Sequence, residues 1–196
     1  MAGLKSPLLV VMSVLAAAAA SCARSPSKPE RAIALSDQFS ADFELIDQSG
    51  RLMRDEDLKG RVAIVYFGFA TCPDVCPLAL GRLSAALNEL TPAEQEKIVP
   101  LFITVDPDRD TPEKIAAYIA FDQRLIGLTG DHAAIDKAKA GFKVYAEPEP
   151  VDDPKIGYTM NHSSLFYLVD KDGGLRYALQ DTLTPVEIAN AVRARL

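Results

Sequence analysis

Two cysteines, Cys72 and Cys76, stand in the short stretch FGFATCPDVCP, which runs from residue 67 to residue 77. Three residues separate them, one more than in the common redox motif, and a proline follows each cysteine. A close cysteine pair can form a structural disulfide, exchange disulfides with another protein, or hold a soft metal ion. The spacing alone leaves these three chemistries open.

The prolines predict how the backbone places the two thiols. A residue before proline is disfavoured in the helical region, so we do not expect both cysteines on one regular helix. Pro77 is expected at the first position of a helix, which makes Cys76 the predicted N-cap residue. The amino end of a helix favours negative charge, so the pKa of a thiol there should fall and thiolate should be available.

A metal ion bound by two thiolates needs a further ligand, and the chain contains only two histidines. His162 lies just before a predicted buried strand, at a loop edge near the sheet, and is the better candidate. Two sulfurs and one imidazole suit copper in either oxidation state, whereas zinc normally takes a fourth ligand. His132 follows Asp131 in a predicted first helical turn, and we expect it to be solvated and not a ligand.

The same residues also allow plainer interpretations. In an exported protein the cysteine pair could form a purely structural disulfide. A histidine ahead of a strand is often only a surface or hydrogen-bonded residue. Asp106, Asp108 and Asp110 form a carboxylate cluster in the sequence, but aspartates crowd loops and helix caps in general. The acidic stretch 147–153 is expected to be solvated.

The amino-terminal residues have the layout of a secretory signal peptide. Lys5 gives a weakly charged start, and the apolar stretch Leu8–Ala20 is short for a membrane span of about 20 residues. Ala19-Ala20-Ser21-Cys22 resembles a bacterial lipoprotein cleavage box, in which Cys22 becomes the lipidated first residue, although Ala19 replaces the usual leucine. An uncleaved anchor with an incidental cysteine is the alternative.

These features predict three segments: a lipoprotein-type signal peptide at residues 1–21, a tether at residues 22–38, and a folded domain at residues 39–196. The domain is then expected to be exported and membrane-anchored, facing the periplasm or an equivalent bacterial compartment, where the environment is oxidising. The chain of 196 residues is sufficient for one domain, and its apolar content of 48 % allows a real core. A net charge of −6 without a basic patch excludes a nucleic-acid binder, and we expect a monomer.

Strands that alternate with helices predict an α/β fold with a mixed sheet. Residues 62–67 and 101–105 are apolar on both faces, as in strands that are buried on both sides. The cysteine stretch follows the first of these strands, at the edge where open α/β sheets bind ligands. Two hairpins are expected, one at 43–46 with 51–53 and one at 164–169 with 175–179. A strand is expected at 142–145 and a loop at 147–154. One predicted helix carries Leu80 to Leu90, and three others start at Thr111-Pro112, Asp131 and Thr184-Pro185.

The stretch 67–77 resembles the signature of the Sco family, also called SenC, which comprises copper-handling assembly factors for cytochrome c oxidase. Three further stretches agree with the family in the same order: VDPDRDTP at 105–112, LTG at 128–130 and MNHS at 160–163. The resemblance covers roughly residues 39–196. Each piece alone is weak, but the combination is highly specific.

The resemblance implies a thioredoxin-like fold with an added amino-terminal hairpin. It also implies that Cys72, Cys76 and His162 bind Cu(I) or Cu(II), and that the protein delivers copper to, or prepares, the CuA site of the oxidase. Two features depart from the family pattern. Members are often held by a membrane-spanning helix, whereas this chain carries the lipidation box at Cys22. Asn161 replaces an aspartate that is common before the histidine, which alters the charge next to the metal.

Three functions therefore remain. The first is a membrane-tethered copper chaperone that passes the metal by ligand exchange to the oxidase subunit with the CuA site, or to another cuproprotein, without bond-making catalysis. The second is a thiol–disulfide oxidoreductase that acts on client cysteines through Cys72 and Cys76 and does not need His162. The third, a peroxidase, would require a single activated cysteine, which the paired spacing does not favour.

Overall fold

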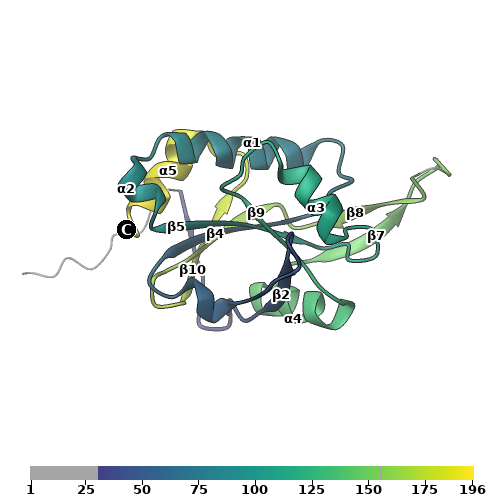
Figure 1. The fold of residues 1–196 in the computed structure, drawn as a ribbon, viewed down its shortest axis with the longest axis horizontal. Helices are drawn as coiled ribbons and strands as arrows, with labels where there is room; N and C mark the ends of the chain where they lie inside the picture. Colours follow the sequence, from purple (N-terminus) through teal and green to yellow (C-terminus); the bar gives the residue numbers. More distant parts are fainter. Residues whose placement is uncertain (1–30, 155) are drawn as a thin grey trace, which may run out of the picture.

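The computed structural model describes residues 31–154 and 156–196, which form an eight-stranded mixed sheet with helices on both faces and a separate two-stranded sheet (Figure 1). The predicted signal peptide and Cys22 lie outside the described residues. The strands are β1 (Ile33–Ala34), β2 (Glu44–Asp47), β3 (Leu52–Arg54), β4 (Val62–Gly68), β5 (Ile98–Thr104), β6 (Ile126–Thr129), β7 (Ala146–Pro150), β8 (Tyr158–His162), β9 (Leu165–Val169) and β10 (Leu175–Gln180). The helices are α1 (Val75–Asn88), α2 (Pro92–Gln95), α3 (Pro112–Ile119), α4 (His132–Phe142) and α5 (Pro185–Arg193), with a 3-10 turn at Asp55–Leu58.

The centre of the sheet is the parallel pair β4 and β5, in which Val62 lies opposite Ile98. Every residue of both strands is buried. Such continuous apolar runs, rich in branched residues, suit strands that are covered on both faces. The full strand order is β1-β10-β9-β4-β5-β6-β2-β3, with β9 antiparallel to β4. The two buried strands predicted from the sequence are confirmed.

The helices divide between the two faces of this sheet. The crossovers β4-α1-β5 and β5-α3-β6 join parallel neighbours, and because such crossovers are right-handed, α1 and α3 cover the same face. Helix α5 packs beside α1, while α4 covers the opposite face (Figure 1). The predicted helical leucines of α1 are buried, among them Leu80, Leu83 and Leu87. The expected α/β, thioredoxin-like arrangement is confirmed.

The predicted amino-terminal hairpin is also confirmed. Strands β2 and β3 pair with each other, and β2 pairs with β6, so the hairpin extends the edge of the main sheet. Three predicted helix starts are correct as well. The side chains of Thr111, Asp131 and Thr184 each accept a hydrogen bond from a backbone N–H in the first turn. Such an N-cap is typically worth about 1 kcal/mol of stability.

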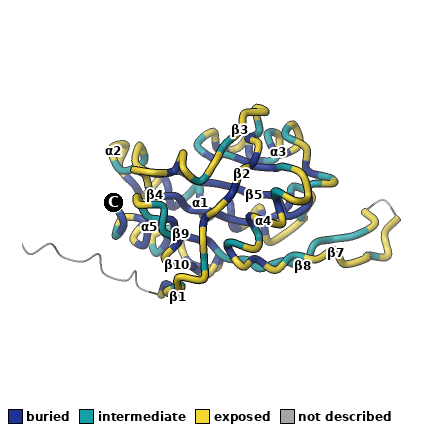
Figure 2. Tube along the Cα trace, turned by 90° about the horizontal axis from the view of Figure 1, so that it is seen from below, coloured by how far each residue is buried: buried dark blue, intermediate teal, exposed yellow. Residues whose placement is uncertain are grey.

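The segment between α4 and β9 differs from the prediction. The strand expected at 142–145 is wrong, because α4 continues to the buried Phe142 and is capped by Lys143, whose backbone is left-handed with φ of 52°. The first half of the loop expected at 147–154 is strand β7, which pairs with β8 to form an arm that projects from the body (Figure 2). The side chains of β7 are exposed, as expected for the acidic stretch.

The beginning of the described chain also differs. Ile33 and Ala34 form β1, which pairs with β10 at the other edge of the sheet, and Ala32 is buried. The last part of the predicted tether, residues 22–38, therefore belongs to the folded domain. In the part of the chain that the structure describes, none of the helices combines the length and apolarity needed to span a bilayer.

Candidate metal centre

The cysteine loop joins the carboxyl end of β4 to the amino end of α1. The helix begins at Val75 with Asp74 as N-cap, so Cys76 is its second residue. The prediction that Cys76 caps the helix is wrong by two positions. Pro77 is tolerated there because a backbone N–H in the first helical turn has no intrahelical partner. Cys76 is fully buried and Cys72 is partly exposed on the loop, and both are free thiols.

The two thiols have opposite electrostatic environments. A hydrogen bond from the Cys76 thiol, together with backbone N–H groups at the start of α1, lowers the pKa of Cys72 to about 5. The Cys76 N–H lies 3.5 Å from the Cys72 sulfur. The same thiol–thiolate bond, reinforced by burial, raises the pKa of Cys76 above its usual range. At neutral pH the pair therefore consists of an outer thiolate and an inner thiol.

His162 reaches the buried cysteine from the other side. It is the last residue of β8, whereas the sequence predicted it in a loop before the next strand. Its Nε2 lies 3.5 Å from the Cys76 sulfur, and its Nδ1 lies 2.9 Å from the carbonyl oxygen of Ser163. Because a carbonyl oxygen only accepts, Nδ1 donates to it, and this hydrogen bond orients the ring with Nε2 directed at the sulfur.

Two aromatic rings hold the imidazole in this orientation. Phe69 meets it edge to face with ring centroids 5.8 Å apart, and Tyr66 does so at 6.3 Å. The Tyr66 hydroxyl donates to Ser164, 2.8 Å away, and Ser164 donates to the Asp181 carboxylate at 2.6 Å. Burial raises the pKa of Tyr66, so the phenol stays neutral next to the thiols. No motif or spacing in the sequence indicates this chain of hydroxyl groups.

The spacing of Cys76 and His162 suits a shared metal ion. Two donor atoms about 2.0–2.3 Å from one ion, at a tetrahedral angle, are about 3.5 Å from each other. Within the described residues, however, no three His, Cys, Asp or Glu side chains are already grouped to hold an ion. The Cys76 sulfur and His162 Nε2 already have this spacing, and the Cys72 sulfur lies beside Cys76, 3.5 Å from its backbone nitrogen.

Gly68, the last residue of β4, makes room for the buried sulfur. A Cβ atom at this position would lie 2.9 Å from the Cys76 sulfur and 3.0 Å from the ring of Phe102. Distances this short leave no space for any side chain. Gly68 was not among the predicted site residues, although a glycine that ends an apolar strand is itself a sign of close approach.

The three aspartates of the 105–112 stretch do not form a ligand cluster. Asp110 is fully buried, and its carboxylate accepts hydrogen bonds from the Ala70 N–H at 2.8 Å and from the Thr104 hydroxyl at 2.6 Å. It thereby fixes the start of the cysteine loop, and burial raises its pKa. Asp108 is exposed and bonds to His132 at 2.8 Å, so His132 is the surface residue that the sequence predicted.

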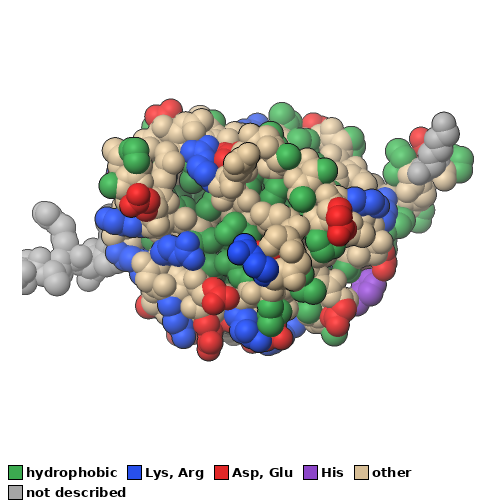
Figure 3. Space-filling view, in the orientation of Figure 1, with side chains coloured by type: hydrophobic (Ala, Val, Ile, Leu, Met, Phe, Trp, Pro, Cys, Tyr) green, Lys and Arg blue, Asp and Glu red, His purple; other side chains and the backbone are tan. Residues whose placement is uncertain are grey.

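The surface around the body is of mixed charge. Acidic and basic side chains both occur across the face shown in Figure 3.

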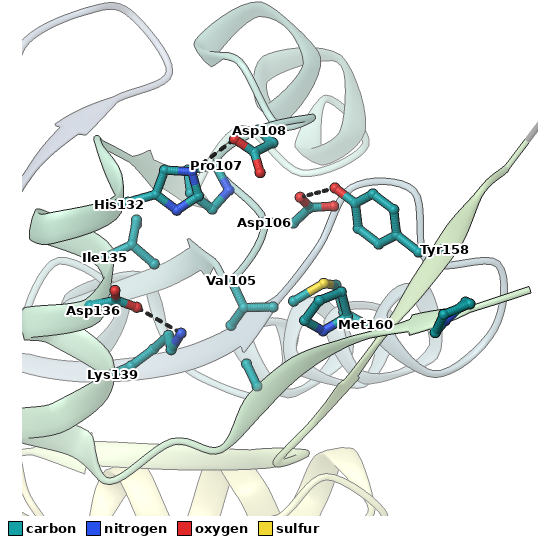
Figure 4. Close-up of a pocket in the computed structure, with 13 residues that line it drawn as sticks. Val105, Asp106, Pro107, Asp108, His132, Ile135, Asp136, Lys139, Tyr158 and Met160 are labelled. Carbon is teal, nitrogen blue, oxygen red and sulfur yellow. Dashed lines mark hydrogen bonds and ion pairs between the residues drawn. The ribbon is translucent and has the colours of Figure 1, made fainter.

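Beside the cysteine loop, a cavity of about 700 Å³ opens between Phe69 and Pro73 on one side and Val151 and Ile156 of the arm on the other. A second cavity, of about 390 Å³, lies between α4 and the arm (Figure 4). Cavities therefore flank the contacts that join the arm to the body.

The fold and these residues define a thioredoxin-like protein with two cysteines beyond the end of its central strand and a histidine that approaches the buried one. The SCO1/SenC family matches residues 31–196, and this chain belongs to that family. Protein sco1 of Schizosaccharomyces pombe is 36% identical over 157 residues, which cover 79% of this chain and 60% of the relative. The chain spans about 60–66% of the length of the first curated relatives that it matches.

Solved structures agree with the fold. Bradyrhizobium japonicum ScoI with copper bound has a TM-score of 0.74 and 38% identity, covering 81% of this chain and 99% of that one. BsSco has a TM-score of 0.63 and 25% identity, covering 82% and 96% of the two chains. BsSco is described as having a disulfide switch and as a member of the Sco family of cytochrome c oxidase assembly proteins.

Proposed function

We propose that this protein binds one copper ion through Cys72, Cys76 and His162, and that it delivers copper to, or prepares, the CuA site of cytochrome c oxidase. The observation that carries the proposal is the 3.5 Å approach of His162 Nε2 to the Cys76 sulfur, with Cys72 four residues away on the adjoining loop. The copper-bound ScoI structure and the description of BsSco point to the same role in relatives.

The donor set fits copper chemically. Soft thiolates favour Cu(I), and imidazole also suits Cu(II). Zinc prefers four ligands, and these three donors are one too few. Cys72 is already a thiolate at neutral pH, and Cys76 must release its proton when the metal arrives. Because one donor lies on an exposed loop, a client can displace it first, and the copper is passed on by ligand exchange.

The proposed setting is a bacterial membrane that faces the periplasm or an equivalent exported compartment. In this proposal the signal peptide 1–21 is removed and Cys22 carries the lipid. Fewer than ten residues would then connect the lipid to the domain, a tether of at most about 30–35 Å. Metabolic labelling with a fatty acid tests this: label should appear on the wild type and disappear in Cys22→Ser, whereas label on both variants would exclude Cys22.

A second candidate function is thiol–disulfide exchange with client cysteines. It is favoured by the asymmetry of the pair, an accessible thiolate at Cys72 and a buried thiol at Cys76. The Cys72 thiolate would attack a client disulfide, and Cys76 would then displace the mixed disulfide. The client would leave as a dithiol and this protein as the Cys72–Cys76 disulfide, which a thiol reductant must reopen.

Anaerobic copper titration of the reduced protein separates the two functions. We expect one copper per chain for the wild type and for the matched control His132→Ala, and sharply weakened binding for His162→Ala. Equal binding without His162, or no binding at all, would favour thiol chemistry. Mixing the copper-loaded protein with a metal-free, reduced CuA fragment then tests delivery, because copper should be found on the fragment after the two proteins are separated.

A further inference from the structure

We propose that Arg109 is a positioning residue that latches the β7–β8 arm to the body and thereby keeps His162 at the thiols. The consequence for copper builds on the proposed function, in which His162 is a ligand. Arg109 belongs to the 105–112 stretch, more than fifty residues before the histidine, and it touches neither cysteine in the described contacts.

The arm needs such a latch because little else holds it. Strands β7 and β8 pair only with each other, and two-stranded sheets are marginally stable in water. Alternation along β8 places Tyr158, Met160 and His162 on one face, toward the body. Met160 packs against the core and lines, with Val105, the cavity between α4 and the arm, and Tyr158 points to Asp106 (Figure 4). The contacts of Tyr158 and Met160 therefore determine where His162 sits.

Arg109 makes the strongest set of these contacts. Its Nη1 donates to the Tyr158 carbonyl oxygen at 2.7 Å, and its guanidinium carbon lies 3.7 Å from the centre of the Tyr158 ring. Its Nε donates to the carboxylate of Asp106, which also accepts the Tyr158 hydroxyl at 2.9 Å. Asp106 is only 3% exposed, so this charge-assisted network is screened little by solvent.

The latch is connected to the metal-binding end of the arm. The ring of Phe69 lies 5.9 Å from the Arg109 guanidinium and 5.8 Å from the His162 ring, so one side chain contacts both. Along β8 the four steps from Tyr158 to His162 span about 13 Å. His162 lies at the base of the arm, three residues before β9, so if Tyr158 leaves Arg109, β8 loses its fixed position against the body and can twist at this base, which turns the imidazole away from the sulfur.

The latch therefore affects one copper oxidation state more than the other. With the arm held, the site offers two sulfurs and a nitrogen, which suits both Cu(I) and Cu(II). With the arm released, only two thiolates remain, and this soft pair retains Cu(I) better than Cu(II). Loss of the latch should weaken Cu(II) binding by about 10–100-fold, the usual effect of removing a group that orients a ligand, and Cu(I) binding clearly less.

Arg124 provides a matched control for general loss of stability. It is also partly buried, pairs with Asp122 at 2.6 Å, and donates to the carbonyl oxygen of Ser84 at 3.2 Å. It lines a cavity with Ile98 and Pro100, at the start of β5 and so at the opposite end of the sheet from the cysteines. Arg124→Leu removes an ion pair of the same kind without touching the arm.

The direct test is NMR of the metal-free protein, which contains only two histidines. In the wild type and in Arg124→Leu we expect nuclear Overhauser contacts from the His162 ring to Phe69 and Tyr66. In Arg109→Leu, and in Tyr158→Leu as a second variant, these contacts should be lost while the amide spectrum of β4 is unchanged. Arg109→Lys should restore them only in part, since lysine lacks the planar fork.

Persistence of the His162 contacts in a folded Arg109→Leu protein would overturn the latch. Copper affinities measured by chelator competition then test the oxidation-state effect, and equal weakening of Cu(I) and Cu(II) would overturn that part. The proposed function fails separately: if His162→Ala binds copper like the wild type, His162 is no ligand, yet the NMR contacts of the metal-free protein still decide whether Arg109 holds the arm.

Discussion

The two halves of the candidate site lie in regions of very different construction. Cys76 sits at the junction of β4 and α1, where every residue of the strand is buried. His162 sits at the base of an arm whose outer strand is exposed and which pairs with no other sheet. The buried core thus fixes the position of the Cys76 sulfur, while a few side-chain contacts fix the position of the His162 imidazole.

This difference suits a protein that must both hold and release a metal. A ligand set built wholly from the core would be rigid, and release would require disruption of the core. A ligand on an arm can be withdrawn at the cost of a few local contacts, because proteins open locally at far lower free energy than they unfold globally. The account therefore predicts that disturbing the two regions has distinct effects.

Amide hydrogen exchange should show the largest difference. The amides of β4 should exchange only through global unfolding, whereas those of β8 should exchange through local opening of the arm. We expect the β8 amides to exchange at least about 1,000-fold faster, given a global stability of about 5–15 kcal/mol. Equal protection in both strands, measured by NMR on the metal-free protein, would mean that the arm opens only when the core does.

The reactivity of Cys72 tests whether the buried Cys76 thiol donates a hydrogen bond to it. Because the Cys76 thiol donates to it, Cys72 should be a thiolate above about pH 5 and lose reactivity as the pH falls below that value. At pH 7 it should carry roughly 30-fold more thiolate than a free cysteine with a pKa of about 8.5. Alkylation rates measured from pH 4 to 9 give the midpoint.

The control for this measurement is Cys76→Ala, which removes the donor. The midpoint for Cys72 should then move up toward the usual range. A midpoint near 8.5 in the wild type, or no shift in the variant, would show that the two thiols do not interact as the structure describes.

Gly68→Ala perturbs the core side of the site sterically. The new methyl group would collide with the Cys76 sulfur and the Phe102 ring, so we expect a loss of about 1–3 kcal/mol in the free energy of unfolding. Gly81→Ala is the matched control, since a Cβ there meets nothing within 4 Å inside α1 and should stabilise by about 0.5–1 kcal/mol. Urea unfolding of both variants checks the difference, and equal effects would refute the steric account.

Glu149→Gln on β7 should have the smallest effect. The side chain is exposed on the outer strand of the arm, so stability should change by less than about 0.5 kcal/mol and copper binding should be unchanged. Urea unfolding and copper titration measure both. A loss above about 1 kcal/mol would show that the outer strand supports the core.

Local sequence patterns were sufficient to predict most of the helices and strands of the body. Thr111-Pro112, Thr184-Pro185 and Asp131 mark helix starts through hydrogen bonds made within one turn, which the sequence displays directly. The buried strands β4 and β5 are equally evident from their uninterrupted apolar residues. The cysteine loop was placed correctly at the end of β4, although the start of α1 was misplaced by two residues.

The arm could not be predicted in the same way. Pro148 and Pro150 argue against a strand, but β7 is an edge strand, where a missing N–H is tolerated. The stacking of Arg109 on Tyr158 and the approach of Gly68 to Cys76 depend on tertiary geometry, since neither pair has a spacing that suggests contact. His162 was named as a candidate from residue type and resemblance, and only the fold reveals its approach to Cys76.

The most direct test of the central claim is X-ray absorption at the copper edge of the protein loaded with one equivalent of copper. The account predicts two sulfur ligands and one imidazole nitrogen for the wild type, and loss of the nitrogen shell in His162→Ala with both sulfurs retained. An unchanged spectrum in His162→Ala, or a wild-type site with fewer than two sulfurs, would contradict the assignment of Cys72, Cys76 and His162 as the copper ligands.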